Sequence, residues 1–313
     1  MSAGMLVGRR KILQGFGAAA VAGAAGLAPS RLSADTPLQP LTRAIPSTGE
    51  QMPVVGLGSW ITFNVGNDPV LLDACAAVVA AFVDNGGRLI DSSPMYGSSQ
   101  ATIGYALKKL RSPNPVFAAD KIWTSYESEG ASQLAETRSL WGLQAMDLMQ
   151  VHNLLSWQAH LDLLQAKKAS GEIRYVGITT SHSRRHDDLE EIMANHPLDF
   201  VQLTYNVLDR EAEQRLLPLA RERGIGVIVN RPYQGGALIK RFAREKLPPF
   251  AADIGANSWP QFFLKFVVAH PAVTCAIPAT TRVEHVTENL AAAAGALPDE
   301  GTRKKMIDYV AQL

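Results

Sequence analysis

The sequence contains very little cysteine. Only Cys75 and Cys275 occur in 313 residues, and they lie in the apolar runs LLDACAAVVA and AVTCAIPAT. Neither cysteine belongs to a metal-ligand pattern, so the sequence predicts no metal site. We expect two structural thiols, one in a buried helix and one in a buried strand. The alternative, in an oxidising compartment, is that the two cysteines pair.

The chain also lacks an excess of charge of either sign. Its 30 basic and 29 acidic side chains give a formal net charge of +1, and no block of Lys and Arg occurs beyond the N-terminus. Proteins that bind nucleic acid through its phosphates usually carry a basic patch, so the composition argues against such a partner. A hydrophobic fraction of 47% is typical of a globular protein. One large domain is allowed, because single α/β barrels commonly have about 250 residues.

No apolar run is long enough to suggest a transmembrane helix, which needs about 20 apolar residues. The best candidate is GFGAAAVAGAAGLA at 15–28, which is Gly- and Ala-rich and follows the basic stretch GRRKILQ. The small residues Ser33 and Ala34 then provide a candidate cleavage point. This layout predicts a signal peptide over residues 1–34, no membrane anchor, and a single folded domain over residues 35–313.

The adjacent Arg9 and Arg10 make this segment resemble a twin-arginine export signal. Gly8 and Ile12 stand where that signal usually has Ser or Thr and Phe. The alternative is an ordinary basic signal region. The resemblance implies the twin-arginine export machinery as a partner and a periplasmic or otherwise exported protein. Because that route exports folded proteins, a cofactor can be loaded in the cytoplasm and carried out.

From residue 54 onward, short β-branched runs alternate with helical stretches. The eight candidate strands are VVGLGSW, RLIDSS, VFAADKIW, DLMQVHN, RYVGITT, DFVQLTY, GVIVN and VTCAIPA. Helical runs between them end near Gly86 and Gly224, where glycine supplies a left-handed cap. This alternation indicates a parallel sheet, and eight units predict an α/β fold of the (β/α)8 TIM-barrel type.

Two further segments and one rival fold qualify this architecture. Extended pieces on either side of Ser47-Thr48-Gly49 predict an N-terminal β-hairpin cap, and the long connection 233–257 is a candidate lid. The rival fold is a doubly wound sheet. No G-x-G-x-x-G follows the first strand, so the nucleotide fingerprint of that rival is missing.

Four polar residues follow apolar runs at the predicted strand ends. They are Asp91 and Tyr96 in the segment 91–99, Lys121 after VFAAD, and His152 after DLMQV. Active sites of TIM barrels gather at the C-terminal ends of the strands. Singly, each residue has an ordinary structural interpretation: a turn carboxylate, a loop aromatic, a surface lysine and a core histidine. Together, at the second, third and fourth strands, they favour a catalytic group.

Carbonyl reduction accounts for these residue types. A carbonyl that receives a hydride on carbon needs a proton on oxygen, which Tyr96 can donate. Because a free Tyr has a pKa of about 10, a cation that favours the phenolate assists this proton transfer, and Lys121 is the candidate. Asp91 is then the counter-charge of the buried ammonium, and His152 orients the carbonyl.

These residues make the chain resemble the aldo-keto reductase superfamily, from residue 41 to the C-terminus. The most specific motif is the segment 89–107, which contains SSPMYGSSQATIGYAL. The other motifs are MPVVGLGSW, MQVHN, GEIRYVGITT, VQLTYN and IPATTRVEHVTENL. The resemblance implies a reductase of aldehydes or ketones, with a small-molecule carbonyl substrate. It assigns Tyr96 as the acid, tuned by Lys121 and Asp91, and His152 as the residue that positions the substrate.

The same resemblance implies a nicotinamide dinucleotide bound across the barrel mouth, with NADP preferred and NAD as the alternative. Gln202 matches the contact to the carboxamide of the nicotinamide, and Glu288 with Asn289 matches the contact to adenine. Arg231 has two possible partners, the cofactor pyrophosphate or a substrate anion. The alternative is that it is a solvated charge at a strand end and binds no ligand. The remaining candidate cofactor-binding residues are Thr179, Thr180, Asn230, Thr280, Thr281 and Arg282.

Two other functions compete with this interpretation. One is a cofactor-binding regulatory or partner subunit of the same fold with little turnover, against which the intact set of four residues argues. The other is a metal-dependent hydrolase, but no H-x-H cluster occurs at the first strand. Substrate choice in such a barrel depends on loops, here 62–69 and 233–257.

Overall fold

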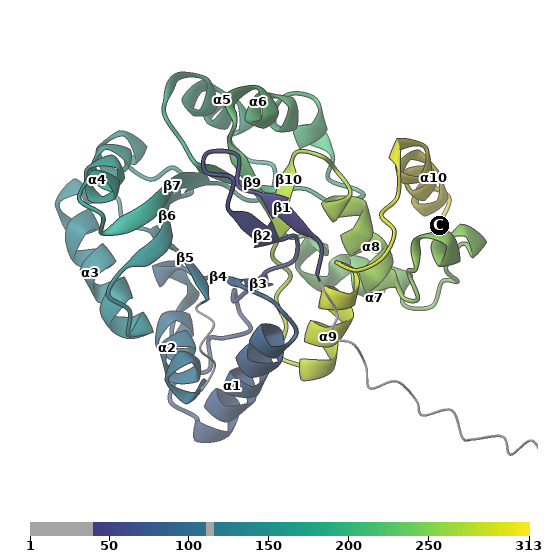
Figure 1. Ribbon diagram of the computed structural model, residues 1–313, viewed down its shortest axis with the longest axis horizontal. Helices are drawn as coiled ribbons and strands as arrows, with labels where there is room; N and C mark the ends of the chain where they lie inside the picture. The colour runs from purple at the N-terminus through teal and green to yellow at the C-terminus, as the bar shows by residue number, and fades with distance from the viewer. Residues whose placement is uncertain (1–39, 111–115) are drawn as a thin grey trace, which may run out of the picture. The chain divides into compact units, whose positions relative to one another are not determined.

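The computed structural model describes residues 40–110 and 116–313 (Figure 1), so the predicted signal peptide, 1–34, lies outside the described residues. Eight parallel strands follow one another around a barrel in chain order. Parallel bridges from Val55 to Ala276 and from Gly58 to Ala279 join the first strand to the last. The strands are β3 (Leu57–Gly58), β4 (Leu89–Asp91), β5 (Phe117–Ile122), β6 (Met146–His152), β7 (Ile173–Thr179), β8 (Phe200–Thr204), β9 (Gly226–Asn230) and β10 (Val273–Ala276). The predicted (β/α)8 barrel is confirmed.

Helices lie around the outside of the barrel (Figure 1). They are α1 (Pro69–Asp84), α2 (Ser99–Lys109), α3 (Gly130–Trp141), α4 (Trp157–Ala169), α5 (His186–Asn195), α6 (Leu216–Arg223), α7 (Ala237–Phe242), α8 (Trp259–Val268), α9 (Val283–Ala291) and α10 (Glu300–Ala311). None of those in the described ranges is long and apolar enough to cross a membrane.

Local sequence explains where these helices begin and end. Asp68 caps α1 by accepting from the backbone N–H groups of Val70 and Leu71. The helical run that begins at Glu211 is split into η3 (Glu211–Glu213) and α6. Pro218 explains the break, because its ring clashes with the carbonyl four residues earlier in a continuous helix. Gly224 then ends α6 in the left-handed conformation, with φ of 65°.

The N-terminal hairpin closes one end of the barrel. Strands β1 (Thr42–Ala44) and β2 (Gln51–Pro53) pair antiparallel, as predicted. Ile45 and Met52 are fully buried, and they pack in one cluster with Leu89, Phe117 and other residues from inside the barrel. The hairpin therefore seals the N-terminal ends of the strands and leaves the opposite end for a site.

Strand periodicity places the functional side chains in the barrel interior. Side chains alternate along a strand, so residues two apart face the same way. Leu89, Ala119, Leu148 and Phe200 all belong to the interior cluster. Two residues further along, towards the C-terminal ends of their strands, come Asp91, Lys121, Gln150 and Gln202. A polar layer therefore lies above the apolar core.

Both cysteines are buried and free, Cys75 in α1 and Cys275 in β10, as predicted. Burial raises the pKa of the Cys75 thiol to about 11. The connection 233–257, the candidate lid, is folded into η4 (Gln234–Gly236), α7 and η5 (Pro249–Ile254). Phe242 of α7 packs on Trp259 of α8, with ring centroids 5.0 Å apart. Its role as a lid stays a prediction.

Candidate active site

The four predicted catalytic residues come together at the C-terminal end of the barrel. Asp91 ends β4, Lys121 lies on β5 and His152 ends β6, while Tyr96 follows β4 in η1 (Pro94–Tyr96). A cavity of about 510 Å³ is lined by Asp91, Tyr96 and His152. Lys121 is fully buried behind them.

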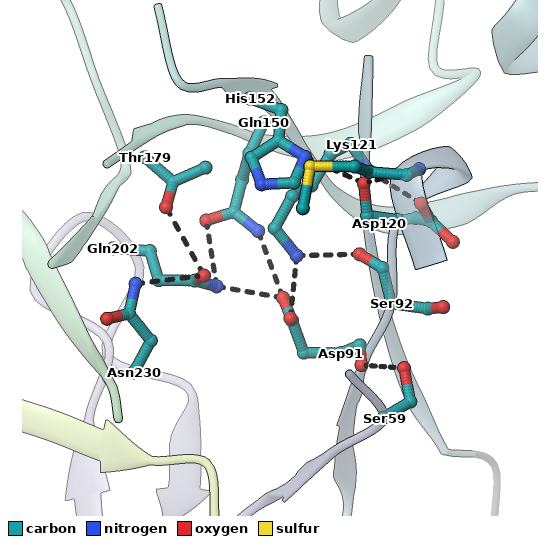
Figure 2. Close-up of polar contacts among 12 residues, drawn as sticks. Ser59, Asp91, Ser92, Asp120, Lys121, Gln150, His152, Thr179, Gln202 and Asn230 are labelled. Carbon is teal, nitrogen blue, oxygen red and sulfur yellow. Dashed lines mark hydrogen bonds and ion pairs between the residues drawn. The ribbon is translucent and has the colours of Figure 1, made fainter. Parts of the chain in front are cut away.

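Asp91 and Lys121 form a buried ion pair. Lys121 Nζ donates to Asp91 Oδ2 at 2.6 Å and to the carbonyl oxygen of Ser92 at 2.6 Å. Asp91 Oδ1 accepts from Gln150 Nε2 at 3.2 Å and from Gln202 Nε2 at 2.8 Å, and Figure 2 shows these amides converging on it. With both partners desolvated, these extra hydrogen bonds compensate the cost of burying charge. Gln150 was not predicted, although its position two residues before His152 places it on the same face of β6.

Tyr96 lines the cavity next to the buried Lys121. Lys121 Nζ lies 5.4 Å from the centre of its ring. Burial raises the pKa of Tyr96 to about 12, while the Lys121 cation lowers it. The influence of Lys121 has the expected direction, but burial outweighs it. The phenol therefore stays protonated near neutral pH.

The turn that carries Tyr96 is fixed by a neighbouring loop. Ser93 caps η1 by accepting from the Met95 N–H. Gly97 has φ of +61°, and a Cβ there would lie 2.3 Å from Asn64 Oδ1. The same Asn64 oxygen accepts from the N–H of Ser98 at 3.0 Å. Position 97 therefore requires glycine. The hydrogen bond from Ser98 to Asn64 joins this turn to the loop after β3, which holds Tyr96 in place.

His152 is a neutral imidazole with a defined partner. Its ring lies edge-on to Tyr96, with centroids 5.8 Å apart. Burial, and then the Lys121 cation, lowers the pKa of His152 to about 2. Ser93 Oγ lies 2.7 Å from His152 Nδ1 and also accepts from the Met95 N–H. If the serine hydroxyl donates to Nδ1, the ring proton resides on Nε2.

A buried carboxylate on the outer face of the barrel, Asp120, was not predicted. It supports β5, the strand that carries Lys121. Asp120 lies on the opposite face of β5 from Lys121 and accepts from Gln100 Nε2 at 3.1 Å and Trp141 Nε1 at 2.7 Å. It also accepts from the Lys121 N–H at 2.7 Å. Burial raises the pKa of Asp120 to about 6. Asp120 therefore ties β5 to α2 and α3.

Most of the predicted cofactor-binding residues line the same cavity. Those that line it are Thr179, Gln202, Asn230, Arg231, Thr280, Glu288 and Asn289. Thr281 and Arg282 are exposed beside it, and Thr180 is buried behind it. Gln202 joins this set to Asp91. Its Oε1 accepts from Thr179 Oγ1 at 3.2 Å, and its amide nitrogen donates to Asp91.

The predicted adenine end is already hydrogen-bonded within the protein. Asn289 Oδ1 accepts from the hydroxyl of Tyr233 at 2.7 Å, and Glu288 accepts from the hydroxyl of Ser258. Thr280 Oγ1 lies 3.2 Å from His285 Nδ1. These contacts fix the side chains at this end of the cavity.

Two polar groups of this set have no hydrogen-bond partner among the residues that the structure describes. The buried Thr180 Oγ1 makes no hydrogen bond in the described part of the chain. Arg231 lines the cavity, and no described residue accepts a hydrogen bond from its guanidinium. A nicotinamide dinucleotide carries phosphates and hydroxyls that match such donors.

Across 40–110 and 116–313, no group of three or more His, Cys, Asp or Glu side chains gathers at a metal-binding distance.

Comparison with known proteins agrees with this geometry. Residues 54–305 match the model of the Aldo/keto reductase family. The chain is 27% identical over 231 residues to the NADH-specific methylglyoxal reductase of Escherichia coli (strain K12), an alignment covering 62% of this chain and 68% of that protein. It is also 27% identical over 237 residues to the aldo-keto reductase YhdN of Bacillus subtilis (strain 168), covering 70% and 69%.

The fold has solved counterparts as well. The aldo/keto reductase from Klebsiella pneumoniae, crystallised with NADP and acetate, superposes with a TM-score of 0.70 at 23% identity. The superposition covers 84% of this chain and 92% of that one. The family match spans most of the barrel and includes Asp91, Tyr96, Lys121 and His152. The chain therefore belongs to the aldo/keto reductase family, a family of NAD(P)H-dependent oxidoreductases.

Proposed function

We propose that this protein reduces aldehydes or ketones to alcohols, with NADPH as the hydride donor and Tyr96 as the general acid. NADH is the alternative donor. One observation carries the proposal: Tyr96 and His152 line one cavity, directly in front of the buried Lys121–Asp91 pair. Among similar proteins, one is named as an NADH-specific methylglyoxal reductase and another was crystallised with NADP.

The residues of the chain divide the work of reduction. The nicotinamide cofactor, when bound, would supply the hydride for the carbonyl carbon. The carbonyl oxygen takes the proton of the Tyr96 hydroxyl, so an alcohol and a transient phenolate form. The Lys121 ammonium, 5.4 Å from the ring centre, stabilises that phenolate until solvent reprotonates it.

His152 orients the carbonyl without competing as an acid. An imidazole whose pKa is lowered to about 2 is neutral at working pH and offers one N–H. With Ser93 donating to Nδ1, this N–H is on Nε2. It donates a hydrogen bond to the carbonyl oxygen and so holds that oxygen for Tyr96.

The cofactor is held by the residues at the ends of the later strands. Thr179, Gln202 and Asn230 take the nicotinamide end near the catalytic layer. Glu288 and Asn289, which also line the cavity, take the adenine end. Hydroxyl and guanidinium donors take the phosphates, a role in which Arg gives paired hydrogen bonds. These donors are Thr280, Thr281 and Arg282.

The test is the variant Y96F, which keeps the ring and removes the proton. We expect kcat for test aldehydes to fall by about 10²–10⁴-fold, the usual contribution of general acid catalysis, with unchanged cofactor affinity by fluorescence titration. The matched control is Y126F, because Tyr126 is 67% exposed and does not line the cavity. A folded, cofactor-bound Y96F with parental kcat contradicts the proposed acid. A parent that binds nucleotide but reduces no carbonyl supports the regulatory-subunit alternative instead.

We further propose that the protein is exported folded through the twin-arginine route. The support is the sequence alone: Arg9 and Arg10, the short apolar run and the candidate cleavage point after Ala34. The mature enzyme then begins at residue 35. A cofactor loaded in the cytoplasm travels with the folded barrel.

A further inference from the structure

One cation of the cavity lining, Arg231, has no hydrogen-bond or ion-pair partner among the described residues. Arg231 follows Asn230, the last residue of β9, and its half-buried side chain lines the cavity. Within the described ranges, its guanidinium donates no hydrogen bond and forms no ion pair. Burial lowers the pKa of Arg231 from its ordinary value, yet an arginine remains charged in proteins. A partly desolvated cation of this kind is stabilised by an anionic ligand.

The backbone holds this arginine in a defined and strained position. Arg231 has φ of +51°, a left-handed conformation that costs free energy in residues other than glycine. Its carbonyl oxygen accepts from Asn206 Nδ2 at 3.2 Å and from the Gln234 N–H at 3.0 Å. Asn206 is fully buried, so the anchor is rigid. The guanidinium is therefore presented to the cavity by structure that is formed before any ligand binds.

The guanidinium lies next to the loop that supports the catalytic tyrosine. Its Cζ lies 6.0 Å from the centre of the Trp60 ring, and a Cβ on Gly235 would lie 3.7 Å from Trp60 and 3.8 Å from Arg231 Nη1. Trp60 belongs to the loop after β3, and Asn64 of the same loop binds the turn after Tyr96. Trp60 also lines the cavity together with the apolar Met95. Arg231 thus lies beside Trp60, in a cavity that Tyr96 and apolar side chains also line.

The carboxylates around the cavity are satisfied elsewhere. Asp209, the acid whose charge acts on Arg231, accepts from Asn206 Nδ2 at 2.8 Å and Gln234 Nε2 at 2.9 Å. Asp91 is paired with Lys121, and Glu288 accepts from the hydroxyl of Ser258. A second cation, Lys240, also lines the cavity. Asp209 therefore offsets part of the Arg231 charge but accepts no hydrogen bond from it, which leaves the planar guanidinium for a ligand.

We propose that Arg231 binds a carboxylate of the substrate, so that the enzyme prefers carbonyl compounds with an apolar body and an acidic group. This inference rests on the proposed carbonyl reductase function. The planar guanidinium forms two parallel hydrogen bonds to a carboxylate, while Trp60 packs against the apolar body. A phosphate of the cofactor is the competing anion, and the experiment distinguishes the two.

The experiment compares an acid with its neutral ester. The substrates are 4-carboxybenzaldehyde and methyl 4-formylbenzoate, and the proteins are the parent, R231Q, R231K and R241Q. We expect R231Q to lower kcat/KM for the acid at least about tenfold more than for the ester, the usual size of a lost charged hydrogen bond. R231K keeps the charge but not the planar pair of hydrogen-bond donors, so its kcat/KM for the acid should lie between the values for R231Q and the parent. R241Q is the matched control, because Arg241 is exposed on α7 and does not line the cavity.

Two binding measurements separate the possible outcomes. Calorimetric titration of 4-(hydroxymethyl)benzoate into the NADP-loaded protein needs no turnover, and R231Q is expected to lose this binding while NADPH affinity stays within about threefold. Equal losses for acid and ester, together with weaker NADPH binding, assign Arg231 to the cofactor and overturn the inference. A parent that binds the benzoate through Arg231 but reduces no carbonyl upholds the inference and refutes the proposed function. A parent without preference for the acid and without benzoate binding overturns it.

Discussion

Lys121 Nζ lies 2.6 Å from Asp91 Oδ2, and both side chains are buried at the base of the cavity. Each charge is tolerated in this position only because the other is there. The two residues are 30 positions apart in the chain and lie on neighbouring strands, β4 and β5. The ion pair therefore links the stability of the barrel to the electrostatics of the site.

Breaking this pair from one side is expected to destabilise the protein more than removing both charges. K121M leaves a buried carboxylate without its cation, and the free energy of unfolding in urea should fall by about 3–5 kcal/mol. The double variant D91N/K121M removes both charges and should recover part of that loss. The control is K304M, because Lys304 is 78% exposed and its substitution should change stability by less than about 0.5 kcal/mol. A double variant as unstable as the sum of the single variants contradicts the coupling.

Ser93 is expected to act as a positioning residue through His152. S93A removes the hydroxyl 2.7 Å from Nδ1, so the imidazole loses its bias towards the Nε2–H tautomer. We expect kcat to fall about tenfold, with partial recovery in S93T, which keeps a hydroxyl. Nitrogen-15 NMR of the imidazole reports the tautomer directly, a readout that a purely structural role does not move. The control is S132A, whose exposed hydroxyl donates to the Glu129 carbonyl instead. An unchanged tautomer in S93A refutes this role.

Acid should destabilise the parent more than a variant without His152. The pKa of His152 is lowered to about 2 in the folded protein, against about 6.5 in the unfolded chain. The stabilisation is therefore complete above pH 6.5 and is lost as the pH falls towards 2, by about 1.4 kcal/mol per pH unit. Between pH 6.5 and 4.5, H152Q should lose about 2–3 kcal/mol less than the parent in urea titrations. Other groups that titrate in this range, such as His270 and Asp120, are present in both proteins. Parallel pH profiles would show that folding does not lower the pKa of His152.

Export is expected to depend on the paired arginines. Replacing Arg9 and Arg10 by Lys keeps the charge of the segment but removes the feature that the export machinery reads. We expect the double variant R9K/R10K to accumulate in the cytoplasm, uncleaved, on fractionation and immunoblotting. The folded protein itself should keep its activity, because this segment precedes the barrel domain. Export of the double variant at the parental rate argues for an ordinary signal peptide.

The fold and the four catalytic candidates were predictable because their signals are local. Eight short, β-branched apolar runs separated by helical stretches mark the strands, and in a parallel barrel all their C-terminal ends meet at one mouth. Asp91, Lys121 and His152 could therefore be grouped without coordinates. The hairpin around Ser47-Thr48-Gly49 was equally local, since a turn between two short strands is set by its own residues.

The supporting contacts were not predictable, because they join residues far apart in sequence. Ser93 and His152 are 59 positions apart, as are Gln150 and Asp91. A serine in a turn or a glutamine in a strand carries no sign of its partner. The partner depends on strand register and on side-chain directions, which follow from the packing of the whole barrel.

The sequence by itself determined the barrel, the end at which the candidate catalytic residues gather and the candidate proton donor, Tyr96. The reason is that strands, helices and strand ends are set by residues close together in the chain. Tertiary structure alone decided the balance of forces on that group. Burial outweighs Lys121 at Tyr96 and raises its pKa to about 12, whereas at His152 burial and Lys121 act together. Arg231 lies beside Trp60 only because the loops after β3 and β9 are neighbours in the folded barrel. Desolvation and charge proximity depend on distance in space, which the order of residues does not specify.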